Sequence, residues 1–312
     1  MIPCLNIIKT GPMASIQDMG RKGYAHLGIT QGGVADEYAF HWANKLLANP
    51  FASPVIEITL GGFEAQFTQR TAFAITGAIN NAFLDEKPIP NWSASLARKG
   101  QRLTIKGPRE GLRNYLALLG GVATPLHHNS AATVTKDALG GLHCDGRNLS
   151  KHDVIGCERP LNPTFKKRSV DPRYIPPLSA TQIIPLRVML GSQHSLFSAD
   201  SITSFFSHIY QVSAQSNKMG YQLTGPAIET PSHSLISEAI TQGAIQVPAN
   251  GQPIIMLCEH QTIGGYLKLG NVARMDLPKL AQAKPGALIR FSEADPESCL
   301  DIYKNWLRFF QN

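Results

Sequence analysis

Short apolar segments bounded by turn-forming residues are the strongest structural constraint in this 312-residue sequence. The segments are about four to eight residues long, and they are rich in Val, Ile, Leu, Thr and Phe. Examples are VIEITLGG, TAFAITGA, PIIMLC and ALIRF, each with Gly, Pro, Asn or a charged residue close by. Runs of this length and composition are typical of β-strands. The sequence therefore predicts a mainly β fold with frequent turns, as found in barrels and sandwiches.

Helical periodicity is confined to a few segments. Asp36 is suited to cap a helix over residues 36–50, in which Tyr38, Trp42 and Leu46 recur at a spacing of four. Three further helices are predicted from apolar residues that gather on one face or from a proline in the first turn; they cover residues 198–210, 276–283 and 297–311.

A proline-rich segment divides the chain into halves of similar size. Residues 158–185 carry six prolines and little apolar periodicity, which is typical of a linker on a protein surface. We therefore predict an N-terminal subdomain over residues 1–157 and a C-terminal subdomain over residues 186–312, which together form one larger domain.

Composition excludes several classes of function. The net charge of +7 is spread along the chain, without the basic stripe and interleaved aromatics of a nucleic-acid binder. No apolar run approaches the roughly 18 residues that span a membrane. Five scattered cysteines without C-x-x-C predict reduced thiols in the cytoplasm and no metal site. Only 16% of the residues are charged, which indicates that a partner chain covers part of the surface.

A glycine-rich run over residues 15–44 is the first candidate for a functional site. It contains five glycines, with Gln17, Asp18 and Arg21 among them, but no G-x-x-x-x-G-K-[ST] phosphate loop. A guanidinium group is suited to binding a carboxylate or a phosphate. The alternative is a plain turn in which Arg21 pairs with Asp18, and the run alone does not decide between the two.

Two later segments are the other candidates. Residues 216–226, SNKMGYQLTGP, place Lys218 and Gln222 in either a site or a surface hairpin. In residues 243–272, Asn250-Gly251 predicts a hairpin turn followed by a long buried strand through PIIMLC. That strand ends in the polar stretch EHQTIGGYLKLG, where a carboxylate is available for acid–base work and two glycines free backbone N–H groups.

Six stretches together resemble one family, the carboxyltransferase-type proteins called allophanate hydrolase subunit 2. They occur in the family's order over nearly the whole chain: SIQDMGRKGYAHLGITQGGVADEYAFHWANKLLAN, IEITLGGFEAQF, GLRNYLALLGGV, SNKMGYQLTGP, SEAITQGAIQVPANGQPIIMLCEHQTIGGYLKLGNV and PGALIRF. The family includes the C-type subunit of 5-oxoprolinase, biotin-dependent carboxyltransferase relatives and the Kip antagonist protein. The resemblance implies a cyclophilin-like β-barrel architecture in two subdomains.

The resemblance also implies a function. It points to a subunit of an ATP-dependent 5-oxoprolinase, an amidohydrolase that opens the cyclic amide 5-oxo-L-proline to L-glutamate. The chain would act with a subunit-1-type partner, similar to the B-type subunit of 5-oxoprolinase, and with a third hydrolase subunit. ATP would be bound with or by those partners, and biotin is the less favoured cofactor. The alternatives are a non-catalytic regulatory binding protein of the Kip antagonist type and a biotin-dependent carboxyltransferase component related to urea amidolyase.

Motif positions and side-chain chemistry give the candidate residues. The proposed catalytic residues are Asp18, Arg21, Glu259 and Lys268. The proposed substrate-binding residues are Gln17, Asp36, Lys218, Gln222, Gln246, Gln252, Thr262, Gly264, Gly265 and Tyr266. Arg21, Lys218 and Lys268 would anchor an anion or a carbonyl group, and Asp18 or Glu259 would act as acid or base.

Some positions depart from the family pattern. The family usually has Arg where this chain has Lys218 and Gln222, and Asp where it has Glu259. Residues 125–141, PLHHNSAATVTKDALGG, lack the family's usual Gly-Ser-x-Ser-Thr. Replacing two guanidinium groups by an ammonium and an amide weakens bidentate anion binding, which slightly favours the regulatory alternative.

Overall fold

The computed structural model describes most of the chain. The described ranges are residues 2–158, 165–179, 181–230 and 236–311. The described residues form four α-helices and nineteen strands. None of the helices among these residues is long and apolar enough to cross a membrane.

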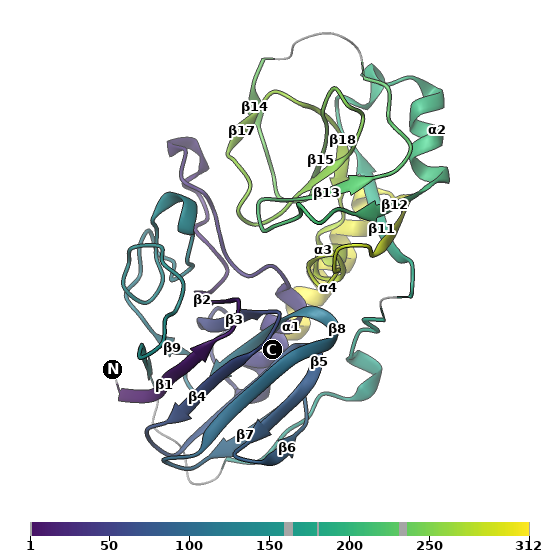
Figure 1. The fold of residues 1–312 in the computed structure, drawn as a ribbon. Coiled ribbons are helices and arrows are strands. Elements are labelled where there is room, and N and C mark those ends of the chain that lie inside the picture. The colour runs from purple at the N-terminus through teal and green to yellow at the C-terminus, as the bar shows by residue number, and fades with distance from the viewer. Residues whose placement is uncertain (1, 159–164, 180, 231–235, 312) are drawn as a thin grey trace. The chain divides into compact units, whose positions relative to one another are not determined.

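The chain divides into two compact units (Figure 1). Unit 1 consists of Met1–Arg21 and Gly32–Leu178, and unit 2 consists of Lys22–Gln31 and Ser179–Asn312. The last division between the units falls inside the predicted linker, residues 158–185. Part of that segment lies outside the described residues, so its course as a linker stays a prediction.

Unit 1 is built on one ten-stranded sheet. Its main path runs β2-β3-β8-β4-β1-β10-β9, and β5 pairs with β6, β7 and β8. All pairings between these strands are antiparallel, which agrees with the short turns of the sequence. The strands are β1 (Ile2–Thr10), β2 (Met13–Gln17), β3 (Val55–Thr59), β4 (Phe63–Phe67), β5 (Thr71–Leu84), β6 (Lys87–Ile89), β7 (Ser93–Ala97), β8 (Arg102–Leu118), β9 (Val122–Ala123) and β10 (Val154–Cys157).

The longest pair in this sheet, β5 and β8, lies side by side in Figure 1. Its register shifts after Gly77, where φ is +87°. A Cβ at this position would lie 2.3 Å from the carbonyl oxygen of Arg113, so only glycine permits the close approach of the two strands.

Helix α1 (Glu37–Leu47) packs against β5 and β8 of unit 1. The Asp36 side chain accepts a hydrogen bond from the Ala39 N–H at 2.9 Å and so caps the helix as predicted. The apolar face of the helix, which includes Phe40 and Leu46, is buried. Burying such a side chain contributes roughly 1.5–3 kcal/mol, so packing rather than helix propensity holds α1 in place.

Unit 2 contains a closed barrel with the strand order β11-β18-β15-β16-β13-β12-β19, and a separate two-stranded sheet of β14 and β17. The barrel strands are β11 (Ile184–Leu190), β12 (Ile209–Val212), β13 (Gly220–Thr224), β15 (Ala244–Val247), β16 (Ile254–Met256), β18 (Leu267–Val272) and β19 (Leu288–Glu293). The small sheet pairs β14 (Glu238–Ala239) with β17 (Ile263–Gly264). The mainly β fold with a barrel and few helices is therefore confirmed.

Unit 2 has helices at the three predicted places, but the first ends before Ile209 and Tyr210, which belong to strand β12 and not to the helix as predicted. The helices are α2 (Ala199–Ser207), α3 (Leu277–Ala281) and α4 (Pro296–Gln311). Helix α2 packs on β19, where the rings of Phe205 and Phe291 stack with their centroids 4.4 Å apart. The Asn250-Gly251 turn joins β15 to β16 as predicted. The strand that follows it is shorter than predicted, because β16 ends at Met256 and the chain then turns.

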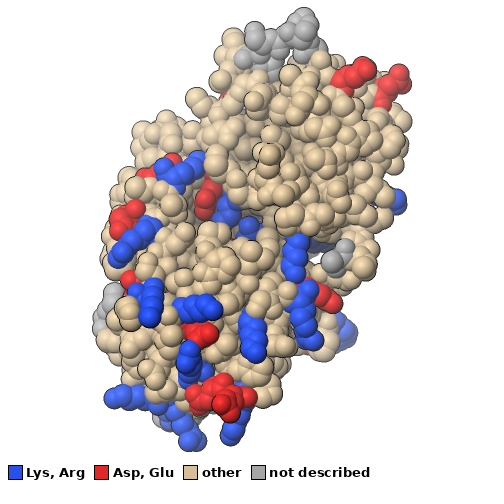
Figure 2. Space-filling model, in the orientation of Figure 1, with Lys and Arg blue, Asp and Glu red and all other residues tan. Residues whose placement is uncertain are grey.

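Charged side chains are unevenly distributed on the face shown in Figure 2. Lys and Arg side chains are numerous on the visible face of unit 1, whereas the visible face of unit 2 carries few charged groups. A weakly charged surface loses less hydration free energy when another chain covers it.

Candidate functional site

The sequence-predicted site residues fall into two groups, one on each unit. Unit 1 carries Gln17, Asp18, Arg21 and Asp36. Unit 2 carries Lys218, Gln222, Gln246, Gln252, Glu259, Thr262, Gly264, Gly265, Tyr266 and Lys268.

In unit 1, the carboxylate of Asp18 accepts three hydrogen bonds. Its Oδ1 accepts from the Gly20 N–H at 2.8 Å and from the Ser130 hydroxyl at 2.6 Å, and its Oδ2 accepts from the Ala131 N–H at 2.6 Å. Asp18 is buried. The side chain therefore fixes the turn after β2 and ties it to a loop more than a hundred residues away in sequence.

The guanidinium group of Arg21 lies in the same region and is 1% exposed. Its Nη2 donates to the carbonyl oxygen of Ala132 at 2.6 Å, whereas its Nε and Nη1 have no hydrogen-bond partner among the described residues. The described residues include no ion pair between Arg21 and Asp18, so the alternative of a local pair is wrong. Burial lowers the pKa of Arg21, and the nearby Asp18 and Asp137 act in the opposite direction.

Gln17 contacts the same loop as Asp18 and Arg21. Its Nε2 donates to the carbonyl oxygen of Thr133 at 3.1 Å, and its Oε1 has no partner among the described residues. Gln17, Asp18 and Arg21 thus bind four consecutive residues, 130–133, through side-chain and backbone groups. That segment lies within residues 125–141, where the sequence departs from the family pattern.

Asp36 has a different environment. Besides capping α1, it offers its backbone N–H to the hydroxyl oxygen of Tyr115 at 2.8 Å. The Tyr115 hydroxyl in turn donates to Glu57 Oε2 at 2.8 Å, and the same carboxylate oxygen accepts from the Ala35 N–H. Asp36 is therefore part of the buried network that starts the helix.

In unit 2, Lys218 and Glu259 form an ion pair. The Lys218 Nζ lies 3.1 Å from Glu259 Oε1, and the side chains are 7% and 17% exposed. The Glu259 N–H also donates to the Lys218 carbonyl oxygen at 2.9 Å. Two of the departures from the family pattern thus meet in one pair, which keeps one positive and one negative partner. The third departure, Gln222, lies on β13 opposite Ile254.

Lys268 belongs to a second polar group of unit 2. Its Nζ donates to Glu238 Oε2 at 2.7 Å and to the Ala239 carbonyl oxygen at 3.2 Å. Gln193 contacts both partners, because its Oε1 accepts from the Lys268 N–H and its Nε2 donates to Glu238. Hydrogen bonds from Lys268 hold the pKa of Glu238 below its usual range.

Gln246 is buried on β15, opposite Lys268 on β18. Its Nε2 has no hydrogen-bond partner among the described residues. A Cβ at Gly264 would lie 2.5 Å from Ile240 Cδ1 and 3.0 Å from this nitrogen, so the close packing at this position requires glycine. A buried amide donor without a partner is suited to hydrogen-bond a carbonyl or carboxylate oxygen.

The remaining predicted residues are less clearly placed for chemistry. Gln252 uses both ends of its amide on Gly225, accepting from the N–H at 2.9 Å and donating to the carbonyl oxygen at 3.1 Å. Thr262 accepts the Ile240 N–H through its backbone. Gly265 and Tyr266 are exposed.

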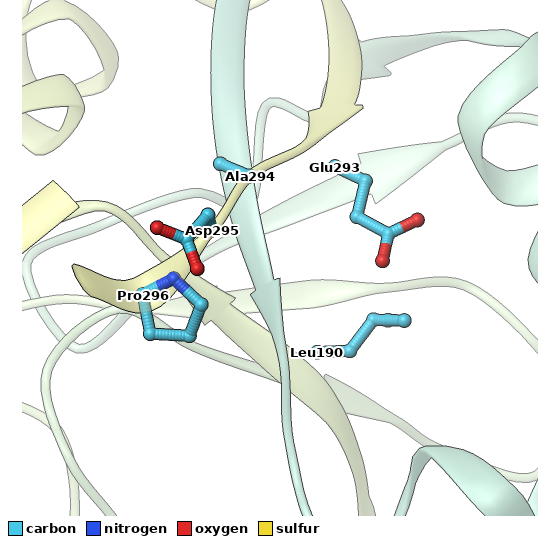
Figure 3. A pocket seen from close by; sticks show the side chains of 5 residues that line it. All are labelled: Leu190, Glu293, Ala294, Asp295 and Pro296. Carbon is cyan, nitrogen blue, oxygen red and sulfur yellow. The ribbon is translucent and has the colours of Figure 1, made fainter. Parts of the chain in front are cut away.

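A hollow in unit 2 lies elsewhere (Figure 3). It is lined by Leu190, Glu293, Ala294, Asp295 and Pro296, none of which the sequence predicted. Asp295 accepts the Ser298 N–H at 2.8 Å in the first turn of α4, which lowers its pKa. The hollow is therefore the junction between β19 and a helix start, and it does not contain the candidate residues.

Sequence reasoning missed several partners of the candidate residues. Ser130, Ala131 and Ala132 hold Asp18 and Arg21, while Glu238 and Gln193 hold Lys268. The alanines contribute only backbone groups, which have no signature in a sequence. Within the part of the chain that the structure describes, no group of three or more His, Cys, Asp or Glu residues could hold a metal ion.

Comparison with known proteins places these features in a family. The model of the carboxyltransferase domain, subdomains A and B, matches residues 27–293. The chain is 35% identical to the C-type subunit of 5-oxoprolinase from Escherichia coli over 309 residues, which cover 98% of this chain and 96% of that protein. It is 31% identical to urea amidolyase of Saccharomyces cerevisiae over 94% of this chain, but over only 17% of that protein.

The fold has a close counterpart among solved structures. The crystal structure of the Kluyveromyces lactis urea amidolyase matches 100% of this chain with a TM-score of 0.91 and 26% sequence identity. The chain spans only 20% of the length of that structure. The sequence match over residues 27–293 and the near-complete match to a curated relative agree with this likeness. The chain belongs to the carboxyltransferase domain family, subdomains A and B.

Proposed function

We propose that the chain is a subunit of a cytoplasmic, ATP-dependent 5-oxoprolinase, which converts 5-oxo-L-proline to L-glutamate. One observation carries the proposal: the match with the C-type subunit of E. coli 5-oxoprolinase covers almost the full length of both chains. The match with yeast urea amidolyase covers a small part of that protein. The E. coli relative is therefore a separate subunit of about the same length as this chain.

The polar groups of unit 2 support amide chemistry. Opening the lactam adds water across the C–N bond, so one group must accept a proton from the nucleophile and one must deliver a proton to nitrogen. Glu259 is the more exposed partner of its ion pair and is suited to exchange a proton with a substrate. The unpartnered amide of Gln246 is suited to bind a carbonyl oxygen.

ATP would supply the phosphoryl group that activates the amide, but this chain's residues do not fit its triphosphate. The sequence has no phosphate loop, and Lys218 and Lys268 are each paired with a carboxylate. The proposal therefore assigns ATP binding to the partner subunits.

Exposed apolar side chains of unit 2 support a role in a complex. Ile236 is 91% exposed, Ile263 is 62% exposed and Met219 is 37% exposed. Apolar residues of this size lower the free energy of association when a partner covers them. We propose the subunit-1-type protein and a third hydrolase subunit as the partners.

The test is ATP-dependent glutamate release from 5-oxo-L-proline by the reconstituted subunits, with this chain present or omitted. We expect turnover only when it is present. Glu259→Gln should lower kcat by about 100-fold or more, since acid–base groups contribute that much. The control is Glu293→Gln, which removes an exposed carboxylate outside the candidate groups. Equal turnover with and without the chain would refute the proposal.

A carboxyltransferase component is the second candidate, because the urea amidolyase structure matches the whole chain. Such a component would have to bind biotin, whereas a 5-oxoprolinase subunit would not. Calorimetry with free biotin separates the two. A regulatory binding protein of the Kip antagonist type would show neither glutamate release nor biotin binding.

A further inference from the structure

Two buried cysteines of unit 1 lie close together at one end of its sheet. Cys4 is on β1 and Cys157 is on β10, and these two strands pair antiparallel. Both side chains are 0% exposed and belong to the hydrophobic core of the unit. The structure holds both as thiols. Neither belongs to the candidate groups, so the proposed function does not account for the pair.

A β-bulge places Cys4 on the same face as Cys157. The register advances two residues along β1, from Pro3 to Leu5, while it advances one residue along β10. Cys4 is therefore the extra residue of the bulge. Neighbouring side chains of a regular strand point to opposite faces, yet Cys4 and Leu5 are both buried. A regular strand with Leu5 in the core would point Cys4 away from Cys157.

One amide group contacts both sulfur atoms. Gln69 lies between β4 and β5, and its Nε2 donates to Cys157 Sγ at 3.3 Å and to Cys4 Sγ at 3.5 Å. The backbone holds this segment against β1 as well, because the Thr68 N–H donates to the Cys4 carbonyl oxygen at 3.1 Å. The side chain of Gln69 thus keeps the two sulfur atoms together in the core.

The Cys4 sulfur is the more reactive of the two. A hydrogen bond from the Cys157 thiol lowers the pKa of Cys4 to about 6, although burial acts in the opposite direction. The same hydrogen bond raises the pKa of Cys157. Because the thiolate is the nucleophile, Cys4 is suited to react with an oxidant first. Since the two sulfur atoms already contact each other, little movement is needed to form an S–S bond of about 2 Å.

The position of the pair in the sheet gives a small oxidant access. The path of the sheet ends in β4-β1-β10-β9, where β10 has four residues and β9 has two. Short strands at the end of a sheet open locally at a lower free-energy cost than the strands at its centre. Ile2 and Pro3, which precede Cys4 on β1, are exposed. A molecule as small as hydrogen peroxide therefore reaches the thiols through local opening.

We propose that Cys4 and Cys157 form a reversible disulfide on oxidation by a peroxide, which cross-links β1 to β10 and stabilises that end of the sheet. The Cys4 thiolate attacks one oxygen of the peroxide, breaks the O–O bond and gives a sulfenic acid and hydroxide. The Cys157 sulfur then attacks the Cys4 sulfur, forms the S–S bond and displaces a second hydroxide. The two sulfurs lose two electrons to the peroxide, and the two thiol protons complete two water molecules. This modification site is independent of the proposed function.

The test is non-reducing peptide mapping of the full chain after treatment with hydrogen peroxide. The remaining thiols are blocked with N-ethylmaleimide under denaturing conditions before digestion. Trypsin separates the two cysteines, because Lys9 ends the peptide of Cys4 and His152 begins the peptide of Cys157. We expect these two peptides as one cross-linked species, lighter than their sum by two hydrogen atoms. Treatment with dithiothreitol should release both peptides.

Variants assign the cross-link to this pair. Cys4→Ser and Cys157→Ser should each abolish it. Cys144→Ser is the matched control, because it removes a more exposed thiol of the same unit and should leave the cross-link unchanged. Gln69→Leu removes the donor that both sulfurs share and should slow the reaction, because the Cys4 thiolate loses a hydrogen bond. Mapping of the wild-type chain needs no variant, so the test stays decisive if a serine variant does not fold.

The effect on the sheet is measured on the oxidised and the reduced chain. A disulfide between residues 4 and 157 removes loop-closure entropy from the unfolded chain, so oxidation should raise the Tm of unit 1 by roughly 5–15 °C. Amide hydrogen exchange in β10 should become slower, while exchange in β19 of unit 2 should not change.

Three results would overturn the inference. The first is alkylation of both Cys4 and Cys157 by N-ethylmaleimide after peroxide treatment. The second is Cys4 found only as a sulfinic or sulfonic acid, or in a disulfide with another cysteine. The third is a cross-link that leaves amide exchange in β10 unchanged, because the disulfide would then not stabilise the end of the sheet.

Discussion

The Nζ of Lys218 lies 3.1 Å from Oε1 of Glu259, and the backbones of the same two residues are joined by a hydrogen bond of 2.9 Å. The pair connects the loop before β13 to the turn after β16. Its two side chains are mostly buried, so neither charge is well solvated without the other.

Breaking this pair should destabilise unit 2. Lys218→Met or Glu259→Gln should each lower the free energy of unfolding by roughly 1–3 kcal/mol, because the remaining partner is left buried without its counterpart. The double variant should lose less than the sum, with a coupling energy of about 0.5–3 kcal/mol in urea unfolding. Strictly additive losses would contradict a direct interaction.

Tyr115 should stabilise the first turn of α1. Its hydroxyl accepts from the Asp36 N–H and donates to Glu57, and burial raises its pKa well above the ordinary value. Tyr115→Phe should cost about 1–3 kcal/mol of stability, because a buried N–H and a buried carboxylate each lose a partner. In Tyr115→Phe, amide hydrogen exchange in the first turn of α1 should be faster than in the wild type. Exchange in α2 should not change, so α2 serves as the internal control. Unchanged exchange in α1 would refute this role.

The Arg187–Asp276 pair should make unit 2 sensitive to acid. Burial by itself raises the pKa of Asp276, but hydrogen bonds from Arg187 and Lys279 outweigh it and hold the pKa below the ordinary 3.8. Because the folded-state pKa is depressed, the stabilisation is present above pH 3.8 and is lost as the pH falls through the folded-state value.

The variant Asp276→Asn tests whether the stabilisation by Asp276 is lost as the pH falls. At pH 7 the variant should be less stable than wild type by about 2–3 kcal/mol, and the difference should shrink below pH 3.8. Asp171→Asn is the matched control: hydrogen bonds from Arg173 lower the pKa of Asp171 too, but the carboxylate is exposed and should contribute little. A pH-independent difference for Asp276→Asn would contradict the linkage.

Gln252 should stabilise the turn between β15 and β16 through its two bonds to Gly225. Gln252→Ala should lower stability by about 0.5–1.5 kcal/mol, and Gln252→Glu should lose less, because it keeps an acceptor for the Gly225 N–H. Thermal unfolding checks the order. Equal stability of the alanine variant and wild type would mean that the two bonds contribute nothing.

Local patterns in the sequence predicted the elements well. The helix at Glu37–Leu47 combines a cap, an apolar spacing of four and a terminating Asn-Pro, which are all short-range signals. The strand after Asn250-Gly251 was predicted too long. The strand ends at Met256 because the chain turns at residues 258–259, where the His260 N–H donates to the Leu257 carbonyl oxygen.

The candidate site was predicted only in part, because short-range signals can be read from the sequence and long-range contacts cannot. Glycines and polar residues marked the run around Gln17, Asp18 and Arg21, because those residue types are unusual after an apolar strand. Their partners in residues 130–133 contribute mainly backbone groups and could not be read from side chains. The pairing of Lys218 with Glu259 spans 41 residues and depends on the barrel's strand order.

The division of the chain has a practical consequence for dissecting the protein. The backbone passes from one unit to the other after residues 21, 31 and 178, because Lys22–Gln31 belongs to unit 2. A fragment that starts at residue 179 lacks those ten residues, and a fragment that stops at 178 carries them without the rest of their unit. A single proteolytic cut therefore cannot release either unit intact. If the gene were divided at residue 178, the second fragment would have to fold and function without residues 22–31 of unit 2.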